Sequence, residues 1–146
     1  MENNTYITIT ARQRDDAGEE AVTRSRAAGN YCEKNGSVYV LYEENPEDGG
    51  PVTRNMIKWK SPILELTRRG SVSTRMVFET GKEYLADYAT SCGCLKMGIL
   101  THSLEAFRRD GFLEIRAEYS LTSDGIPFSH CRLLIRTHIP SQPGVA

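Results

Sequence analysis

Alternation of apolar and polar residues between positions 112 and 122 is the feature that most limits what this chain can fold into. Five apolar side chains recur at every second position there: Leu113, Ile115, Ala117, Tyr119 and Leu121. A period of two places one face of a β-strand in a core and the other in solvent, whereas an amphipathic helix has a period of 3.6. Weaker alternation runs through residues 6–11 and 130–136. The pattern predicts an all-β protein.

Turn sequences separate these segments in the way that β-hairpins require. Asn35-Gly36, Asp110-Gly111 and Asp124-Gly125 each lie between β-prone segments, and such pairs tolerate the positive φ of a type I′ turn. Short strands joined by tight turns predict an antiparallel sheet. Closure into an up-and-down β-barrel would hide the sheet edges, and a β-sandwich is the alternative. A barrel of about eight strands holds its own side chains or one small ligand.

Length and local composition predict one domain followed by a short tail. Its 146 residues predict a single domain over 1–146, with the barrel over 5–137 and a loose tail over 138–146. Two segments, 82–90 and 103–109, have helical spacing but are too short to stand alone as helices, so we predict strands there.

Charge and the chain's ends exclude several classes of protein. Lys and Arg number 18 against 19 Asp and Glu, which argues against a strongly basic nucleic-acid binder and an acidic disordered chain. The polar N-terminus lacks the features of a secretory signal, and no run approaches the ~18 apolar residues of a membrane span. Four irregularly spaced cysteines then indicate reduced thiols and a cytoplasmic location. We expect neither nucleic acid nor membrane as a partner.

Three blocks of sequence carry a resemblance to a known family: Gly29-Asn30-Tyr31 with Lys34–Val40 and Tyr42-Glu43-Glu44; Arg68-Arg69-Gly70 with Met76-Val77-Phe78; and Tyr88-Ala89-Thr90 with Gly93–Met97 and Thr101. Together they resemble the YwiB-like family of bacterial β-barrel proteins, over about Thr5 to Thr137. That family looks like a small calycin, related in shape to lipocalins. The resemblance implies a barrel and a cytoplasmic bacterial protein, and it implies no established activity. The turn at 90–93 departs from the Thr-Pro-aromatic-Gly turn common in members.

Charge is distributed unevenly along the chain. Residues 51–76 contain six basic side chains and one acid, whereas residues 33–48 contain five acids and one lysine. Opposite charges on neighbouring strands can pair across a sheet surface, where each pair contributes ~0.2–1 kcal/mol. The other interpretation concerns Arg68, which shares its strand parity with Leu64 and Leu66 and would point inward with them.

An inward Arg68 would need a counter-charge, because arginine stays ionised and an unpaired buried guanidinium is costly. An acidic group on a ligand could supply it, with Tyr88 or Tyr119 lending a hydroxyl. The alternative is a strand-end arginine that reaches solvent. A ligand site would leave a void of roughly 300 Å³ or more. The predicted ligand-binding residues are Arg68, Leu66, Met76, Phe78, Tyr88, Met97 and Tyr119.

Catalytic templates are missing from the sequence. It contains no Gly-x-Ser-x-Gly, His-Glu-x-x-His, phosphate loop or Gly-x-Gly-x-x-Gly, so we predict no catalytic residue and no cofactor. Cys92-x-Cys94 is a weak metal signal, and we expect buried, inert thiols there. The favoured function is a non-enzymatic barrel that binds a small apolar or amphipathic molecule in its interior. The alternative is a packed barrel that acts as a protein-interaction or homo-oligomeric module, such as a homodimer, and an enzyme using the barrel mouth is least favoured.

Overall fold

The computed structural model describes residues 3–45 and 49–141, and these residues form ten β-strands without a helix. The two prolines and two glycines of residues 45–51 predict a loop there. Its residues 46–48 and the last five residues of the predicted tail lie outside the described residues. No helix in the described part of the chain could cross a membrane. The strands are β1 (Thr5–Asp15), β2 (Glu20–Lys34), β3 (Ser37–Glu44), β4 (Thr53–Lys60), β5 (Ile63–Arg69), β6 (Thr74–Phe78), β7 (Glu83–Thr90), β8 (Gly93–Arg109), β9 (Phe112–Ser123) and β10 (Ile126–His138).

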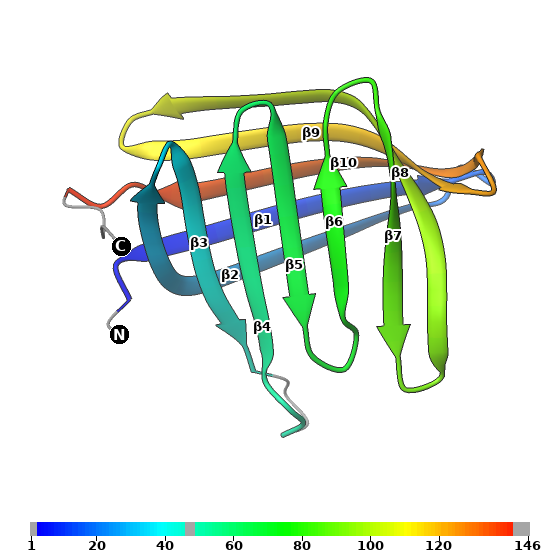
Figure 1. Cartoon of the computed structure of the whole chain (residues 1–146), viewed down its shortest axis with the longest axis horizontal. Coiled ribbons are helices and arrows are strands. Elements are labelled where there is room, and N and C mark those ends of the chain that lie inside the picture. Colours follow the sequence, from blue (N-terminus) through cyan, green and yellow to red (C-terminus); the bar gives the residue numbers. More distant parts are fainter. Residues whose placement is uncertain (1–2, 46–48, 142–146) are drawn as a thin grey trace.

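All ten strands belong to one antiparallel sheet with the order β6-β5-β4-β3-β2-β1-β10-β9-β8-β7. Except for β6 and β7, consecutive strands of the chain are neighbours in the sheet, and β1 also pairs with β10, which joins the two ends of the chain (Figure 1). The predicted up-and-down antiparallel barrel is therefore confirmed. Both segments with helical spacing are strands: 82–90 lies in β7 and 103–109 ends β8.

The barrel is nearly closed where the first and last strands of the sheet, β6 and β7, meet. Ser73 and Ala89 exchange two backbone hydrogen bonds of 2.9 and 2.8 Å across this seam, outside any longer ladder. At the turn between the two strands, Glu79 accepts a hydrogen bond of 2.7 Å from the Tyr84 hydroxyl and pairs with Lys82 at 3.0 Å. A single bridge and one polar cluster thus hold this seam, whereas every other pair of neighbouring strands is joined by a full ladder.

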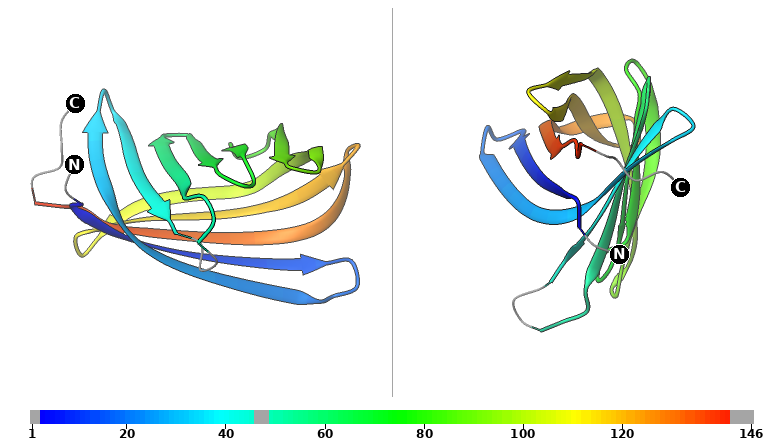
Figure 2. Two further views of the ribbon diagram at one scale, coloured as in Figure 1. Left: turned by 90° about the horizontal axis from the view of Figure 1, so that it is seen from below. Right: turned by 90° about the vertical axis from the view of Figure 1, so that its left-hand side faces the viewer.

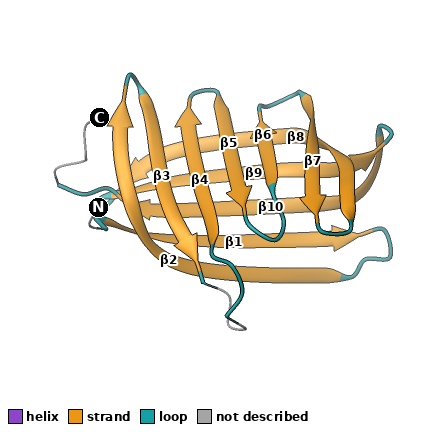
Figure 3. Ribbon diagram, turned by 60° about the horizontal axis from the view of Figure 1, so that its bottom comes forward, coloured by secondary structure: helices purple, strands orange, loops and turns teal. Residues whose placement is uncertain are grey.

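Two walls of different strand length face each other across the interior. The long wall consists of β2, β1, β10, β9 and β8, and the short wall of β3 to β7 crosses it steeply (Figures 2 and 3). At one end Arg108 of β8 binds Glu33 of β2 at 2.6 Å, and this hydrogen bond is the main reason that the pKa of Glu33 is lowered. This ion pair connects β8 and β2, the two outer strands of the long wall.

The core confirms the alternation predicted from the sequence. The five alternating residues of β9 are between 1 and 8 % exposed. Across the interior, Leu64 and Phe78 of the short wall are fully buried. The three predicted turns have positive φ at both central residues, from Asn35 (53°) and Gly36 (79°) to Asp124 (51°) and Gly125 (78°). Hairpins of this type match the twist of the strands that they join.

Truncating a core residue tests the inward assignment. We expect Leu64→Ala to lower the free energy of unfolding by about 2–5 kcal/mol, since it removes buried methyl groups and leaves a cavity. Leu85→Ala is the matched control, because Leu85 is 75 % exposed and its truncation should change stability by about 0.5 kcal/mol or less. Urea denaturation measures both. Equal losses in the two variants would contradict the assigned faces.

Candidate functional site

Four of the predicted interior residues lie together inside the barrel. The Tyr88 hydroxyl donates to Met76 Sδ at 3.5 Å, and the edge of the Phe78 ring meets Tyr119 with centroids 4.9 Å apart. Leu66 lies opposite Met76 in the β5–β6 ladder. These side chains touch one another and the core around them, an arrangement that favours a packed interior. Met97, the remaining candidate besides Arg68, lies opposite Ala86 in the β7–β8 ladder.

Arg68 lies at the solvent-exposed end of β5. Its register partners, Asn55 and Thr74, place it on the inner face of the strand, as the parity argument predicted. Burial, and to a lesser extent the charge of Glu44, raise the pKa of Tyr42 to about 12 against the opposing charge of Arg68. The charge of Arg68 thus affects the pKa of Tyr42 and not that of Tyr88 or Tyr119. Its exposure matches the strand-end alternative, and its role with a ligand stays a prediction.

The interior also contains polar groups. Burial is the main cause of the raised pKa of both Tyr119 and Cys131, so each stays protonated and able to donate a hydrogen bond. The hydroxyls of Thr101 and Thr74 are buried without a hydrogen-bond partner among the described residues. Buried polar atoms without partners are rare and call for a water or a ligand. The interior therefore has a small unmet capacity for hydrogen bonding.

The expectation of buried thiols at Cys92 and Cys94 is wrong, because both residues are exposed. Cys92 lies in the β7–β8 turn, where its N–H donates to Thr90 Oγ1 at 3.1 Å, and the end of this hairpin is open to solvent. Over the described ranges, no group of three or more His, Cys, Asp or Glu side chains could hold a metal ion. The spacing of these two cysteines therefore carries no metal site in this part of the chain.

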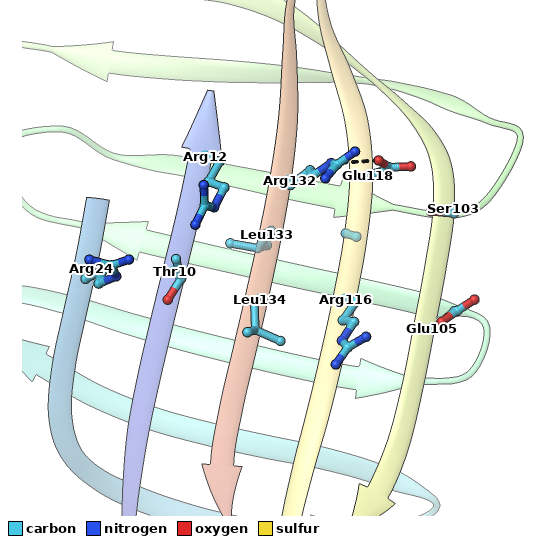
Figure 4. A pocket seen from close by; sticks show the side chains of 11 residues that line it. Thr10, Arg12, Arg24, Ser103, Glu105, Arg116, Glu118, Arg132, Leu133 and Leu134 are labelled. Carbon is cyan, nitrogen blue, oxygen red and sulfur yellow. Dashed lines mark hydrogen bonds and ion pairs between the residues drawn. The ribbon is translucent and has the colours of Figure 1, made fainter. Parts of the chain in front are cut away.

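A hollow of about 670 Å³ on the outside of the long wall was not predicted (Figure 4). Four arginines from four adjacent strands line it: Arg24 of β2, Arg12 of β1, Arg132 of β10 and Arg116 of β9. Arg12 lies directly opposite Arg132 in the β1–β10 ladder. Thr10, Ser103, Leu134, Glu105 and Glu118 are also among its lining residues. We call this feature the arginine hollow.

Ion pairs satisfy some of these arginines. Arg132 binds Glu118 at 2.9 Å, whereas the contact between Arg12 and Glu20 is longer, at 3.6 Å. Arg116 reaches Glu114 at 3.5 Å. Arg24 is exposed and makes no hydrogen bond or ion pair with the described residues. The lining itself contains four arginines and two glutamates, and Glu20 and Glu114, which are not among the lining residues, partly neutralise Arg12 and Arg116.

The sequence did contain a signal for this hollow. Arg12-x-Arg14 and Arg24-x-Arg26 place arginines on one face of a strand at period two. The total charge does not reveal them, because 18 Lys and Arg are balanced by 19 Asp and Glu, and the most uneven run of charge lies at 51–76. That segment is partly neutralised across the short wall, where Arg54 contacts Glu43 at 3.7 Å and Arg75 binds Glu65 at 2.9 Å. The cross-strand interpretation of its charge is thus confirmed for these two pairs.

Comparison with known proteins places this barrel in a family. A model described as a domain of unknown function, DUF1934, matches residues 7–135. The chain belongs to the DUF1934 family. It is 30 % identical over 107 residues to the uncharacterized beta-barrel protein YwiB of Bacillus subtilis (strain 168), an alignment covering 73 % of this chain and 74 % of that protein. The crystal structure of ywiB protein from Bacillus subtilis has the same fold, with a TM-score of 0.80, 22 % identity, and coverage of 95 % of this chain and 93 % of the other. The resemblance seen in the sequence is confirmed.

The burial of the cysteines predicts their order of alkylation. Under native conditions we expect iodoacetamide to label the exposed Cys92 and Cys94 first and Cys131 last, since Cys131 is buried and its pKa is raised, and only the thiolate reacts. Peptide mass spectrometry after timed pulses measures the order. All four thiols should react at similar rates in urea. Native labelling of Cys131 as fast as that of Cys92 would contradict the packed interior.

Proposed function

We propose that the protein is a non-catalytic binding protein and that the arginine hollow holds a small multiply charged anion. The supporting observation is the direct opposition of Arg12 and Arg132 across β1 and β10. Like charges at directly opposed positions destabilise a sheet, and a bound anion would reverse that cost. A cytoplasmic location belongs to the proposal, and the four free cysteines support a reducing compartment.

The register of the long wall supports a ligand with at least two anionic groups. Arg24, Thr10, Leu134 and Arg116 form one row across the wall, because each lies opposite the next. Arg24 and Arg116 are thus three strand spacings apart, or about 14 Å between backbones. Their side chains can approach one ligand from opposite sides, with the Arg12 and Arg132 pair in the adjacent row.

Guanidinium chemistry narrows the ligand to phosphates and carboxylates. The planar donor fork of arginine matches both groups in bidentate geometry, and the hydroxyls of Thr10 and Ser103 add donors at the lining. A volume of about 670 Å³ lies within the range of roughly 300–1,000 Å³ typical of small-molecule sites. Glu105 and Glu118 would disfavour a large polyanion and favour a compact ligand.

Inorganic pyrophosphate provides a direct probe of the hollow. We expect isothermal titration calorimetry to show binding to the wild-type protein, and Arg24→Ala to weaken it about tenfold, the loss expected for one hydrogen bond to a charged group. Arg24 has no partner in the described structure, so its truncation should leave the fold intact. Arg69→Ala is the control, because Arg69 is exposed on the short wall. No binding by the wild type, or equal losses in both variants, would rule out this site.

A ligand in the barrel interior, as in calycins, is the second candidate. The buried hydroxyls of Thr101 and Thr74, which lack partners among the described residues, support it. Tyr88 and Tyr119 would then offer hydroxyl donors beside Met76. The contacts that already fill this region argue for a ligand smaller than that of a lipid carrier.

Native mass spectrometry of freshly purified protein separates the two candidates. An interior ligand predicts a mass above that of the chain, retained in Arg24→Ala and lost in Tyr119→Phe, which removes a buried hydroxyl. An anion retained in the arginine hollow predicts the opposite result. The added mass should be lost in Arg24→Ala and kept in Tyr119→Phe, because Arg24 would hold the anion and Tyr119 would not. A mass equal to that of the chain alone, in all three proteins, removes the support for a tightly bound interior ligand.

A further inference from the structure

One edge of the long wall has no neighbouring strand in the described part of the chain. β2 pairs with β1 from Glu20 to Gly29, but it pairs with β3 only from Gly29 to Lys34. Residues 20–28 are therefore the outer edge of the sheet, as Figure 3 shows for the lower side of β2. Where β2 leaves β3, a crevice of about 990 Å³ opens between residues 25–28 and the end of β3, so the short wall does not cover the edge.

The hydrogen-bond pattern identifies which backbone groups face outward. Asp15 N donates to Glu19 O at 3.0 Å, and hydrogen-bonded pairs alternate along an antiparallel ladder. The odd-numbered residues of β2 therefore bond to β1. The even-numbered residues, Glu20, Val22, Arg24 and Arg26, direct their N–H and C=O groups to the open edge. The same parity follows from the other side, because Lys34 and Ser37 flank a two-residue turn and pair with each other.

We propose that two copies of this chain pair through residues 20–26 of β2, antiparallel and with a two-fold axis at Thr23. In this register Glu20 lies opposite the partner's Arg26, and the symmetry repeats the pair. Val22 lies opposite the partner's Arg24. Each even-numbered pair exchanges two backbone hydrogen bonds, so the two long walls become one continuous sheet. This inference is independent of the anion site.

Charge complementarity favours a second copy as the occupant of the edge. Along the even positions the charges run from negative at Glu20, through neutral Val22, to positive at Arg24 and Arg26, and such a sequence is complementary to its own reverse. Moving the axis to Arg24 would set that arginine opposite itself, which is unfavourable. Arg26 makes no ion pair with the described residues, and Glu20 has only contacts of 3.6 and 3.9 Å to its own chain.

The edge also lacks most of the backbone features that keep free strands apart. Proteins protect such edges with proline, bulges, short strands or charged side chains. Residues 20–28 contain no proline and pair with β1 without a register shift, and the charges of Glu20 and Arg26 are complementary in the proposed register. The opposite edge of the long wall, in β8, follows a bulge between Thr101 and Ser103. Val22 is 43 % exposed at the proposed interface. The difference between the two edges assigns the pairing role to β2.

Reversal of single charges tests the register through mixing. We expect sedimentation velocity to show a wild-type dimer, and Glu20→Arg or Arg26→Glu to weaken it about tenfold or more, the factor for a loss of 1.4 kcal/mol. Each variant alone would place like charges opposite each other. Mixed together, the two variants should form a heterodimer, because the new arginine at 20 then meets the new glutamate at 26 at one end and the native Arg26 meets the native Glu20 at the other. Arg69→Glu, on the short wall, is the control and should leave the dimer unchanged.

A backbone variant tests the edge itself. Val22→Pro removes an N–H that faces the open edge and none that bonds to β1, so it should give a folded monomer with an unchanged circular dichroism spectrum. A monomeric wild type at all accessible concentrations would overturn the proposal. A dimer that survives Val22→Pro, or that is lost in Arg24→Glu and kept in Arg26→Glu, would overturn it as well.

Discussion

The pairing of the first strand with the last is the interaction on which the other features depend. The β1–β10 ladder runs from Ile7 opposite Thr137 to Asp15 opposite Ser129, and it joins segments that lie at the two ends of the chain. At its buried end the hydroxyls of Thr5 and Thr137 are 2.9 Å apart. Without this ladder the long wall would not exist, because only the β1–β10 pairing joins β2 and β1 to β10, β9 and β8. The facing arginines of the hollow would then be separated.

The two faces of the long wall differ in composition, and this difference explains how the protein tolerates those arginines. The inner face carries the apolar core, where Ile7, Ile115 and Ile135 are at most 1 % exposed. Burial of such side chains contributes about 1.5–3 kcal/mol each. A like-charge contact on the outer face costs roughly 0.2–1 kcal/mol. The core can therefore offset the like-charge contact on which the proposed anion site depends.

The sequence was sufficient for the strands, the turns and most of the inward positions, because each depends on neighbours in the chain. Period two identified the buried face of β9, and the Asn-Gly and Asp-Gly pairs identified three turns. The seven predicted ligand residues share the inner-face register, and Met76, Phe78, Tyr88 and Tyr119 do meet.

The rest depended on register between distant strands, which the sequence does not encode locally. Arg12 and Arg132 lie 120 positions apart in the chain, and only the β1–β10 ladder makes them neighbours. The exposed end of β5 at Arg68 and the exposed turn at Cys92 depend on where the walls end. Gly29 is similar: a Cβ there would lie 2.5 Å from Leu41 O, so glycine is required where β2 passes from one wall to the other, a point that alternation alone could not locate.

The two proposed uses of β2 depend on different atoms of the same residues. The anion site needs the guanidinium of Arg24, whereas the edge needs backbone N–H and C=O groups and the charges of Glu20 and Arg26. In the proposed dimer, the hollow of each copy would approach the two-fold axis through Arg24, and both Arg26 side chains would be neutralised by the partner's Glu20. Pairing would then neutralise Arg26, which otherwise competes with the hollow for anions. Arg24 would stay free, because Arg24 lies opposite the uncharged Val22 of the partner. In the dimer the unpaired positive charge of β2 would therefore lie in the hollow. The anion site and the dimer would nevertheless each form without the other.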